Sequence, residues 1–317
     1  MSRRSVRIAS ALILCLPLTI GSTAAAASEN VQVRLRSAVD AVSAGAPFTV
    51  LIHFQIRPGW HIYWKNPGDS GLPPRVTWML PRGFQAGPIE WPVPERLLAE
   101  GLMSYGYTRE ATLPVRITPP ATLGPDSVRI AGALEWLECK EACLAGSSAL
   151  RLSLPVSPQL VKGDSDITAR SRLPVSPDGW SLSAQAGSRA IALDFTPPRG
   201  ITPKGAYFFV DQPLVTEHAA PQRFQRTRTG YRLTLEPAAN ASGNLARLSG
   251  VLEIEGSGRM KSGSAIQVDV PVVPGDPAPA PAPSTPREWP VAATALALAF
   301  AVGLLIFVRR RSASTRT

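Results

Sequence analysis

The sequence of 317 residues has few of the side chains that bind metal ions, with only 3 cysteines and 3 histidines. His53, His61 and His218 are scattered without metal-ligand spacing. A single C-x3-C pair supplies two of the roughly four ligands that a structural zinc ion needs. The sequence therefore argues against zinc, and we predict no bound metal ion and no organic cofactor.

The chain also lacks the motifs of common enzyme classes. It contains no apparent Ser/His/Asp triad, phosphate-binding loop or paired-carboxylate motif, so a hydrolase or a kinase has no support. A net charge of +10 can indicate nucleic-acid binding, but much of it lies in Arg3, Arg4 and Arg7 and in the arginines after residue 308. There it sets membrane topology, and we predict no nucleic-acid partner.

Both ends of the chain have the composition of membrane-targeting segments. Residues 1–27 combine arginines, an apolar run and a small-residue stretch, which is the plan of a signal peptide cleaved near Ala27. Residues 289–308 carry no charge and are long enough to cross a bilayer, and three arginines follow at once. We predict a single transmembrane helix over 289–308, a cytoplasmic tail over 309–317 and an exported chain between the two ends.

The exported part has the pattern of β structure. Short segments rich in valine, isoleucine, threonine and aromatic residues are separated by clusters such as NPGDSGLPP, and no sustained helical periodicity occurs between the two ends. This pattern predicts an all-β fold of sandwiches. The predicted strands cover residues 31–35, 48–56, 75–79, 112–117, 127–137, 180–184, 190–195, 206–210, 231–235, 248–254 and 265–270.

A polar, poorly patterned stretch around residues 158–178 divides these strands into two groups. We predict one β-sandwich domain over residues 28–160 and a second over 161–273. The proline- and alanine-rich residues 274–288 then form an extended linker to the membrane.

Two cysteines, Cys139 and Cys143, are separated by three residues, whereas Cys15 lies in the predicted signal peptide and is lost with it. In an exported protein a disulfide between them is allowed. A disulfide that closes a loop of about five residues stabilises the folded state by only about 2 kcal/mol through chain entropy, against more than 4 kcal/mol for a loop of 100 residues. Closely spaced thiols instead suit thiol–disulfide exchange, because one attacks a partner and the other resolves the mixed disulfide.

A redox-active pair is therefore the working hypothesis for the two cysteines. A structural disulfide and a Cu(I) site, with His53, His61 or Met103 as further ligands, stay open as alternatives. Acidic neighbours disfavour a thiolate, so we expect neither thiol to have a pKa well below 7. These neighbours are Glu135, Glu138 and Glu141.

An aromatic cluster contains Trp60, His61, Tyr63 and Trp64. We interpret it as core and edge aromatics of a strand that enters a turn, with a ligand-stacking platform as the alternative. His61 is a candidate proton shuttle for the thiols, against a structural role for a lone histidine among aromatics.

Five motifs occur in the order GWHIYWKNPGDSGLPP, GPIEWPVPERL, GLMSYGY, LPVRITPP and WLECKEAC. Together they resemble the N-terminal domain of the thiol:disulfide interchange protein DsbD family. The resemblance is closest to its ScsB-type relatives, which are linked to suppression of copper sensitivity. It covers residues 30–157, and residues 175–273 are similar to the second β domain of the ScsB-type ectodomain.

The resemblance implies an immunoglobulin-like periplasmic domain that passes electrons from a membrane donor to periplasmic thiol proteins of thioredoxin-like or disulfide isomerase-like type. It implies that Cys143 forms the mixed disulfide, that Cys139 resolves it, and that Tyr105 and Tyr107 shield the pair. The chain would then be anchored in the inner membrane as part of a protein-disulfide reductase system.

The chain departs from the family in having one predicted membrane helix with no cysteine in it. Electrons must then come from a separate multi-helix membrane protein. The alternative is a non-catalytic interaction or copper-binding module in which Cys139 and Cys143 are a staple or Cu(I) ligands.

Overall fold

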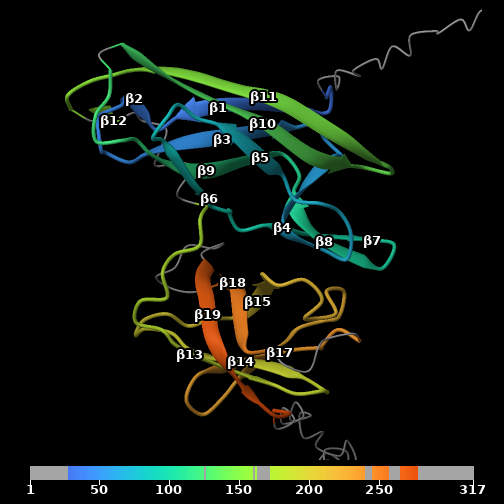
Figure 1. Ribbon diagram of the computed structural model, residues 1–317. Helices are drawn as coiled ribbons and strands as arrows, with labels where there is room; N and C mark the ends of the chain where they lie inside the picture. The colour runs from blue at the N-terminus through green and yellow to red at the C-terminus, as the bar shows by residue number, and fades with distance from the viewer. Residues whose placement is uncertain are drawn as a thin grey trace, which may run out of the picture. The chain divides into compact units, whose positions relative to one another are not determined.

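A computed structural model describes residues 28–124, 126–159, 161–162, 172–239, 245–256 and 265–277. The predicted signal peptide (1–27), transmembrane helix (289–308) and tail (309–317) lie outside these residues, as does all but the start of the predicted linker. The described residues form β-strands and no helix (Figure 1). None of them therefore belongs to a helix that could span a membrane. The prediction of an all-β fold is confirmed for this part of the chain.

The first sandwich packs a four-stranded sheet against a six-stranded sheet around one apolar core (Figure 1). In spatial order the four-stranded sheet contains β1 (Val31–Ser37), β3 (Phe48–Ile56), β9 (Glu110–Thr118) and β6 (Gln85–Ile89). The six-stranded sheet contains β11 (Cys143–Pro155), β10 (Ser127–Cys139), β4 (His61–Gly68), β8 (Leu102–Tyr107) and β7 (Glu95–Ala99), with β5 (Arg75–Met79) paired to β10. The short strands β2 (Val39–Ala41) and β12 (Val161–Lys162) pair beside it.

Strand β10 shows why this sequence forms a sandwich. Its residues alternate between buried and solvent-facing positions, with Val128, Ile130, Leu134 and Trp136 all pointing into the core. Successive side chains of a strand point to opposite faces of the sheet, so this alternation fixes which face is buried. The same inward face continues one step further, to Glu138.

The second sandwich is built from a single path of seven strands. Its order is β15 (Gly205–Val210), β18 (Arg247–Glu255), β19 (Ala265–Pro274), β13 (Ser181–Ala186), β14 (Ile191–Thr196), β17 (Tyr231–Leu235) and β16 (Arg223–Arg226). β19 pairs antiparallel with β18 along its first part and parallel with β13 along its last three residues. This change of partner wraps the strands around a second apolar core.

The described residues up to Asp276 belong to one compact unit. A division into domains over 28–160 and 161–273 stays a prediction.

The predicted strands 48–56, 75–79 and 231–235 have the observed bounds of β3, β5 and β17. The strands without a predicted range include β4 and β11, although the aromatic residues at the start of β4 were interpreted as part of a strand that enters a turn. β4 continues through Asn66 and Pro67, which resemble turn residues, and its pairing with β8 is irregular between Tyr63 and Gly68. A proline is tolerated in a strand at such an irregularity, so the turn signal was misleading.

Candidate functional site

The two cysteines form a disulfide that closes the tip of the β10–β11 hairpin. The two strands pair along their whole length, from Ser127 opposite Pro155 to Cys139 opposite Cys143. The cysteines are thus direct cross-strand neighbours, with Cα atoms 4.1 Å apart and residues 140–142 as the connecting loop. Hairpin register brings the sulfur atoms together, and no distant element is needed to do so.

The two cysteines differ strongly in exposure. Cys139 is only 3% exposed, because β4 pairs with the far edge of β10 and places His61 directly opposite it. Cys143 is exposed, because β11 is the edge strand of its sheet. A thiolate from another protein can therefore reach Cys143, whereas Cys139 is covered.

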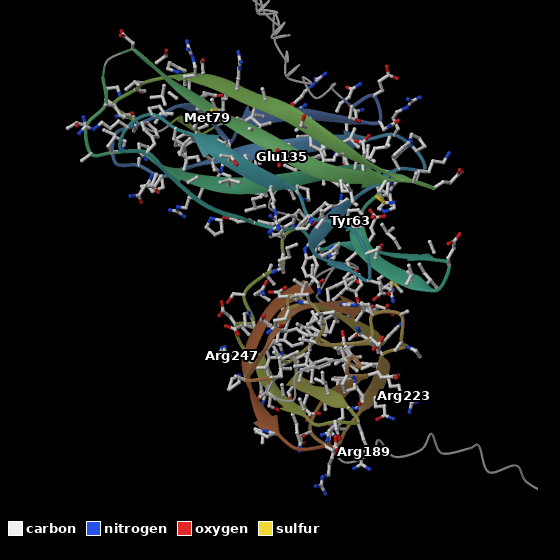
Figure 2. The ribbon with its side chains drawn as sticks, turned by 45° about the vertical axis from the view of Figure 1, so that its right-hand side comes forward. Tyr63, Met79, Glu135, Arg189, Arg223 and Arg247 are labelled. Carbon is white, nitrogen blue, oxygen red and sulfur yellow. A yellow bond between two sulfur atoms is a disulfide. The ribbon has the colours of Figure 1, made fainter. Side chains whose placement is uncertain are left out.

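The side chain of Tyr63 contacts both sulfur atoms. Its hydroxyl donates a hydrogen bond to Cys139 Sγ at 2.9 Å and lies 3.8 Å from Cys143 Sγ. The ring is 2% exposed, and Figure 2 shows Tyr63 beside the yellow disulfide bond. His61, two residues earlier on β4, has its Nε2 atom 3.3 Å from the same hydroxyl. The contacts form a chain from His61 through Tyr63 to Cys139.

Burial sets the protonation of both members of this chain. It raises the pKa of the Tyr63 phenol, and a hydrogen bond from Ser70 opposes the rise. It lowers the pKa of His61 below the ordinary value of 6.5. Near neutral pH the phenol therefore keeps its proton and the imidazole is uncharged. Tyr63 is thus a proton donor aimed at Cys139.

Glu138 is a buried carboxylate next to Cys139, with 2% exposure. Ser28 donates its hydroxyl at 2.6 Å, and Asn30 and Trp136 donate side-chain N–H groups at 3.0 and 2.9 Å. These hydrogen bonds offset the cost of burying the group. They also attach the first described residues of the chain to the end of β10. The other two predicted acidic neighbours, Glu135 and Glu141, are exposed.

Tyr105 and Tyr107, predicted to shield the pair, are each 1% exposed and lie on β8. The Tyr105 hydroxyl is 2.9 Å from that of Tyr207, and the Tyr107 hydroxyl donates to the carbonyl of Pro92 at 2.8 Å. Only the family resemblance suggested that these two tyrosines lie near the cysteines. Their shielding role stays a prediction.

Of the proposed copper ligands, His61 lies beside the cysteines, opposite Cys139 on the paired strand. His53 Nδ1 lies 2.9 Å from the Thr112 hydroxyl on the other sheet, and β8 carries Met103. Within the described ranges, no group of three or more histidine, cysteine, aspartate or glutamate residues is placed to hold a metal ion.

From the sequence, Tyr63 was interpreted as a core or edge aromatic, with a ligand-stacking platform as the alternative, and was not connected with the disulfide. The available signal was the H-x-Y spacing, which places His61 and Tyr63 on the same face of a strand. Its meaning depends on the pairing of β4 with β10, two segments that are distant along the chain. Glu138 lies two residues after Trp136 on the same strand, so its side chain points to the same inward face. This direction could also have been predicted from the sequence.

The family described as "Thiol:disulfide interchange protein DsbD, N-terminal" matches residues 29–155. The crystal structure of the N-terminal periplasmic domain of ScsB from Proteus mirabilis superposes with a TM-score of 0.57 at 18% identity, covering 78% of this chain and 95% of that one. The E. coli chaperone DraB matches with a TM-score of only 0.20 at 11% identity, covering 75% of this chain and 97% of the chaperone. No curated protein is significantly similar to the chain.

The ScsB structure shows a shared fold that extends over both sandwiches. The immunoglobulin-like sandwich predicted from the motifs is thereby supported, and the family match coincides with strands β1 to β11. Residues 29–155 form a domain of the DsbD N-terminal family.

Proposed function

We propose that this protein is a periplasmic thiol–disulfide exchange protein, anchored in the inner membrane by residues 289–308. It passes reducing equivalents through Cys139 and Cys143 to periplasmic thiol proteins of thioredoxin-like or disulfide isomerase-like type. A separate multi-helix membrane protein supplies the electrons. The observation that carries the proposal is a hairpin-tip disulfide, with one exposed and one buried cysteine, in a DsbD N-terminal domain.

Reduction begins when a thiolate of the donor attacks Cys143 Sγ, the exposed sulfur. A bond forms between the donor and Cys143, and the bond to Cys139 breaks. Cys139 leaves with the electron pair as a thiolate. The second thiolate of the donor then attacks its own sulfur in the mixed disulfide and releases the Cys143 thiolate. The donor dithiol loses two electrons and becomes a disulfide, and the cysteine pair gains them.

Delivery to an acceptor reverses these roles. The Cys143 thiolate attacks the disulfide of the acceptor and expels one of its sulfurs as a thiolate. Cys139 then attacks Cys143 Sγ, the mixed disulfide breaks, and the acceptor leaves as a dithiol. Since Cys139 is covered, a partner protein cannot reach it, and its reaction is with the sulfur of Cys143. This geometry supports Cys143 as the residue that forms the mixed disulfide and Cys139 as the residue that resolves it.

Tyr63 assists the step in which Cys139 leaves. Its hydroxyl already donates to Cys139 Sγ, so the proton is in place as negative charge develops on that sulfur. His61 Nε2 contacts the same hydroxyl. A hydrogen bond to a thiolate is stronger than one to a neutral sulfur, so Tyr63 favours the reduced pair.

The reduction potential of the Cys139–Cys143 bond tests the proposal. We expect a value above about −300 mV in glutathione or dithiothreitol buffers, because structural disulfides generally lie below that limit and exchanging ones above it. The measurement is the fraction of alkylated cysteine by mass spectrometry across the buffer series. A potential below about −300 mV would place the bond with inert staples and reject the proposal.

Replacing Tyr63 with phenylalanine is expected to slow reduction by dithiothreitol by about tenfold or more, since a placed proton donor typically contributes at least that much. The ring and its packing are kept and only the hydroxyl is lost. Acid quenching at timed intervals, followed by alkylation and mass spectrometry of the two cysteines, gives the rate. The matched control is Tyr107→Phe, which removes a hydroxyl bonded to Pro92 instead of to sulfur. Equal rates for Tyr63→Phe and the unmodified protein would remove Tyr63 from the mechanism.

A further inference from the structure

The segment NPGDSG, residues 66–71, has no role in the chemistry described so far. It includes the end of β4, just beyond Tyr63, and the turn that follows. Within the compact unit that reaches Asp276, its side chains also contact the second sandwich. The segment is therefore in contact with the redox site on one side and with β15 and the loop after it on the other.

On the redox side, the backbone of the segment lies against the ring of Tyr63. A Cβ atom at Gly71 would be only 2.2 Å from the Tyr63 ring, and the φ angle of Gly71 is +104°. No other residue type fits at this position without displacing the ring or the turn. Ser70 lowers the pKa of the Tyr63 phenol against the effect of burial, and its own hydroxyl lies 3.2 Å from that of Ser104. The turn thus packs directly against the Tyr63 ring and limits where it can move.

On the other side, the second sandwich holds the segment at two points. The Asn66 amide, 1% exposed, donates to the carbonyl of Val210 at 2.8 Å. His218 Nδ1 lies 3.0 Å from Asp69 Oδ1, and the His218 side chain is 5% exposed. The Asn66 amide also lies 3.4 Å from His218 Nε2. Both ring nitrogens of His218 therefore face the segment, Nδ1 at the Asp69 carboxylate and Nε2 at the Asn66 amide.

Asp69 connects these contacts to β8. Its Oδ2 atom accepts the backbone N–H of Met103 at 2.7 Å, and its own N–H donates to the Met103 carbonyl at 2.9 Å. One carboxylate thus joins His218 of the second sandwich to a strand of the first. Since the contact with His218 and both bonds to Met103 converge on Asp69, a loss of His218 removes one of the three contacts that hold this end of the segment.

We infer that His218 is a positioning residue for the disulfide: it holds residues 66–71 against Tyr63, so that the second sandwich influences the redox behaviour of Cys139 and Cys143. The inference rests on the proposed function. It gives residues 181–274 a task in the exchange reaction, although none of them contacts the sulfur atoms through a hydrogen bond among the described contacts.

The test is the reduction potential of full-length His218→Leu. A looser turn weakens the hydrogen bond from Tyr63 to Cys139, and that bond favours the reduced pair. We expect the equilibrium constant for reduction by glutathione to fall by about three- to tenfold, a shift of about 15 to 30 mV to more negative potential. His218→Gln can still donate a hydrogen bond to Asp69, so its reduction potential is expected to lie close to that of the unmodified protein.

Two further variants separate positioning from a general loss of stability. In a Tyr63→Phe background, His218→Leu is expected to have no additional effect on the potential, because its influence passes through the lost hydroxyl. Lys65→Met removes the 2.7 Å ion pair to Asp211, which joins the same two sandwiches without touching residues 66–71. This control is expected to leave the potential unchanged. If His218→Leu does not fold, Asp69→Asn is expected to shift the potential in the same direction by a smaller amount.

Three results would overturn the inference: a His218→Leu potential equal to that of the unmodified protein, an equal shift in the Tyr63→Phe background, or an equal shift with Lys65→Met. Each of these leaves the proposed function intact, because the unmodified protein still exchanges. A failure of the proposed function is recognised separately, by an unmodified protein with a potential below about −300 mV.

Discussion

Replacing Cys139 with alanine is expected to turn the protein into a covalent trap, and replacing Cys143 with alanine is expected to abolish capture. Cys143 is exposed on an edge strand, so its free thiol can attack a disulfide and stays bound when the resolving thiol is gone. Cys139 is 3% exposed and is covered by the β4 side of the hairpin. We expect at least about a tenfold difference in mixed-disulfide yield between the two variants.

The measurement uses two disulfide probes: oxidised glutathione, and an oxidised periplasmic thioredoxin-like protein. Mixed disulfides are quantified by intact-mass spectrometry under non-reducing conditions, and the double variant lacking both cysteines gives the background. Acidic neighbours and a buried partner cysteine favour exchange that depends on docking, so the protein probe is expected to react faster than glutathione. Equal yields for Cys139→Ala and Cys143→Ala would contradict the assigned roles, and no adduct with either probe would reject exchange altogether.

Replacing Glu138 with leucine is expected to lower the free energy of unfolding by about 3 kcal/mol. The change removes the acceptor for Ser28, Asn30 and Trp136. A hydrogen bond to a charged group contributes about 1.5 to 3 kcal/mol, and an indole N–H left unpaired in the core adds a penalty of its own. Ser28 and Asn30 can regain water if the first strand loosens, which keeps the loss below the sum of the separate bonds.

Urea unfolding under oxidising conditions, followed by tryptophan fluorescence, measures this loss. Glu135→Leu is the matched control, since it lies on the same strand three residues earlier but faces solvent. It is expected to change stability by less than about 0.5 kcal/mol. Glu138→Gln keeps one acceptor oxygen and is expected to fall between the two. A loss below about 1 kcal/mol for Glu138→Leu would show that the buried carboxylate is not a stabilising anchor.

The Glu138 geometry changes the interpretation of the acidic residues around the cysteines. As a sequence, Glu135, Glu138 and Glu141 look like one acidic group. In the fold, Glu138 faces the core and is saturated with donors, and the other two face solvent. Water and ions screen the exposed pair, so the charge felt at the sulfur atoms depends on strand parity as well as on residue type.

Local patterns in the sequence were sufficient for the elements whose structure is itself local. Strand-favouring residues and flanking turn residues predicted β3, β5 and β17 with their observed bounds, because these signals are local to the segment and need no distant partner. The close spacing of Cys139 and Cys143 likewise indicated a disulfide, because a hairpin of three loop residues is enough to bring them together. The motifs identified the family, and the family match covers the domain they suggested.

The environment of that disulfide was decided only in three dimensions. Tyr63 is 76 residues away from Cys139, and it meets the sulfur because β4 pairs with the end of β10 at one register. The influence of His218 depends on contacts between segments about 150 residues apart. A strand records in its sequence which face is buried, but not which strand will lie beside it. Strand pairing depends on how all the apolar faces of the domain are buried at the same time. The sequence by itself therefore determined the pair of thiols, and the tertiary structure determined which residues surround them.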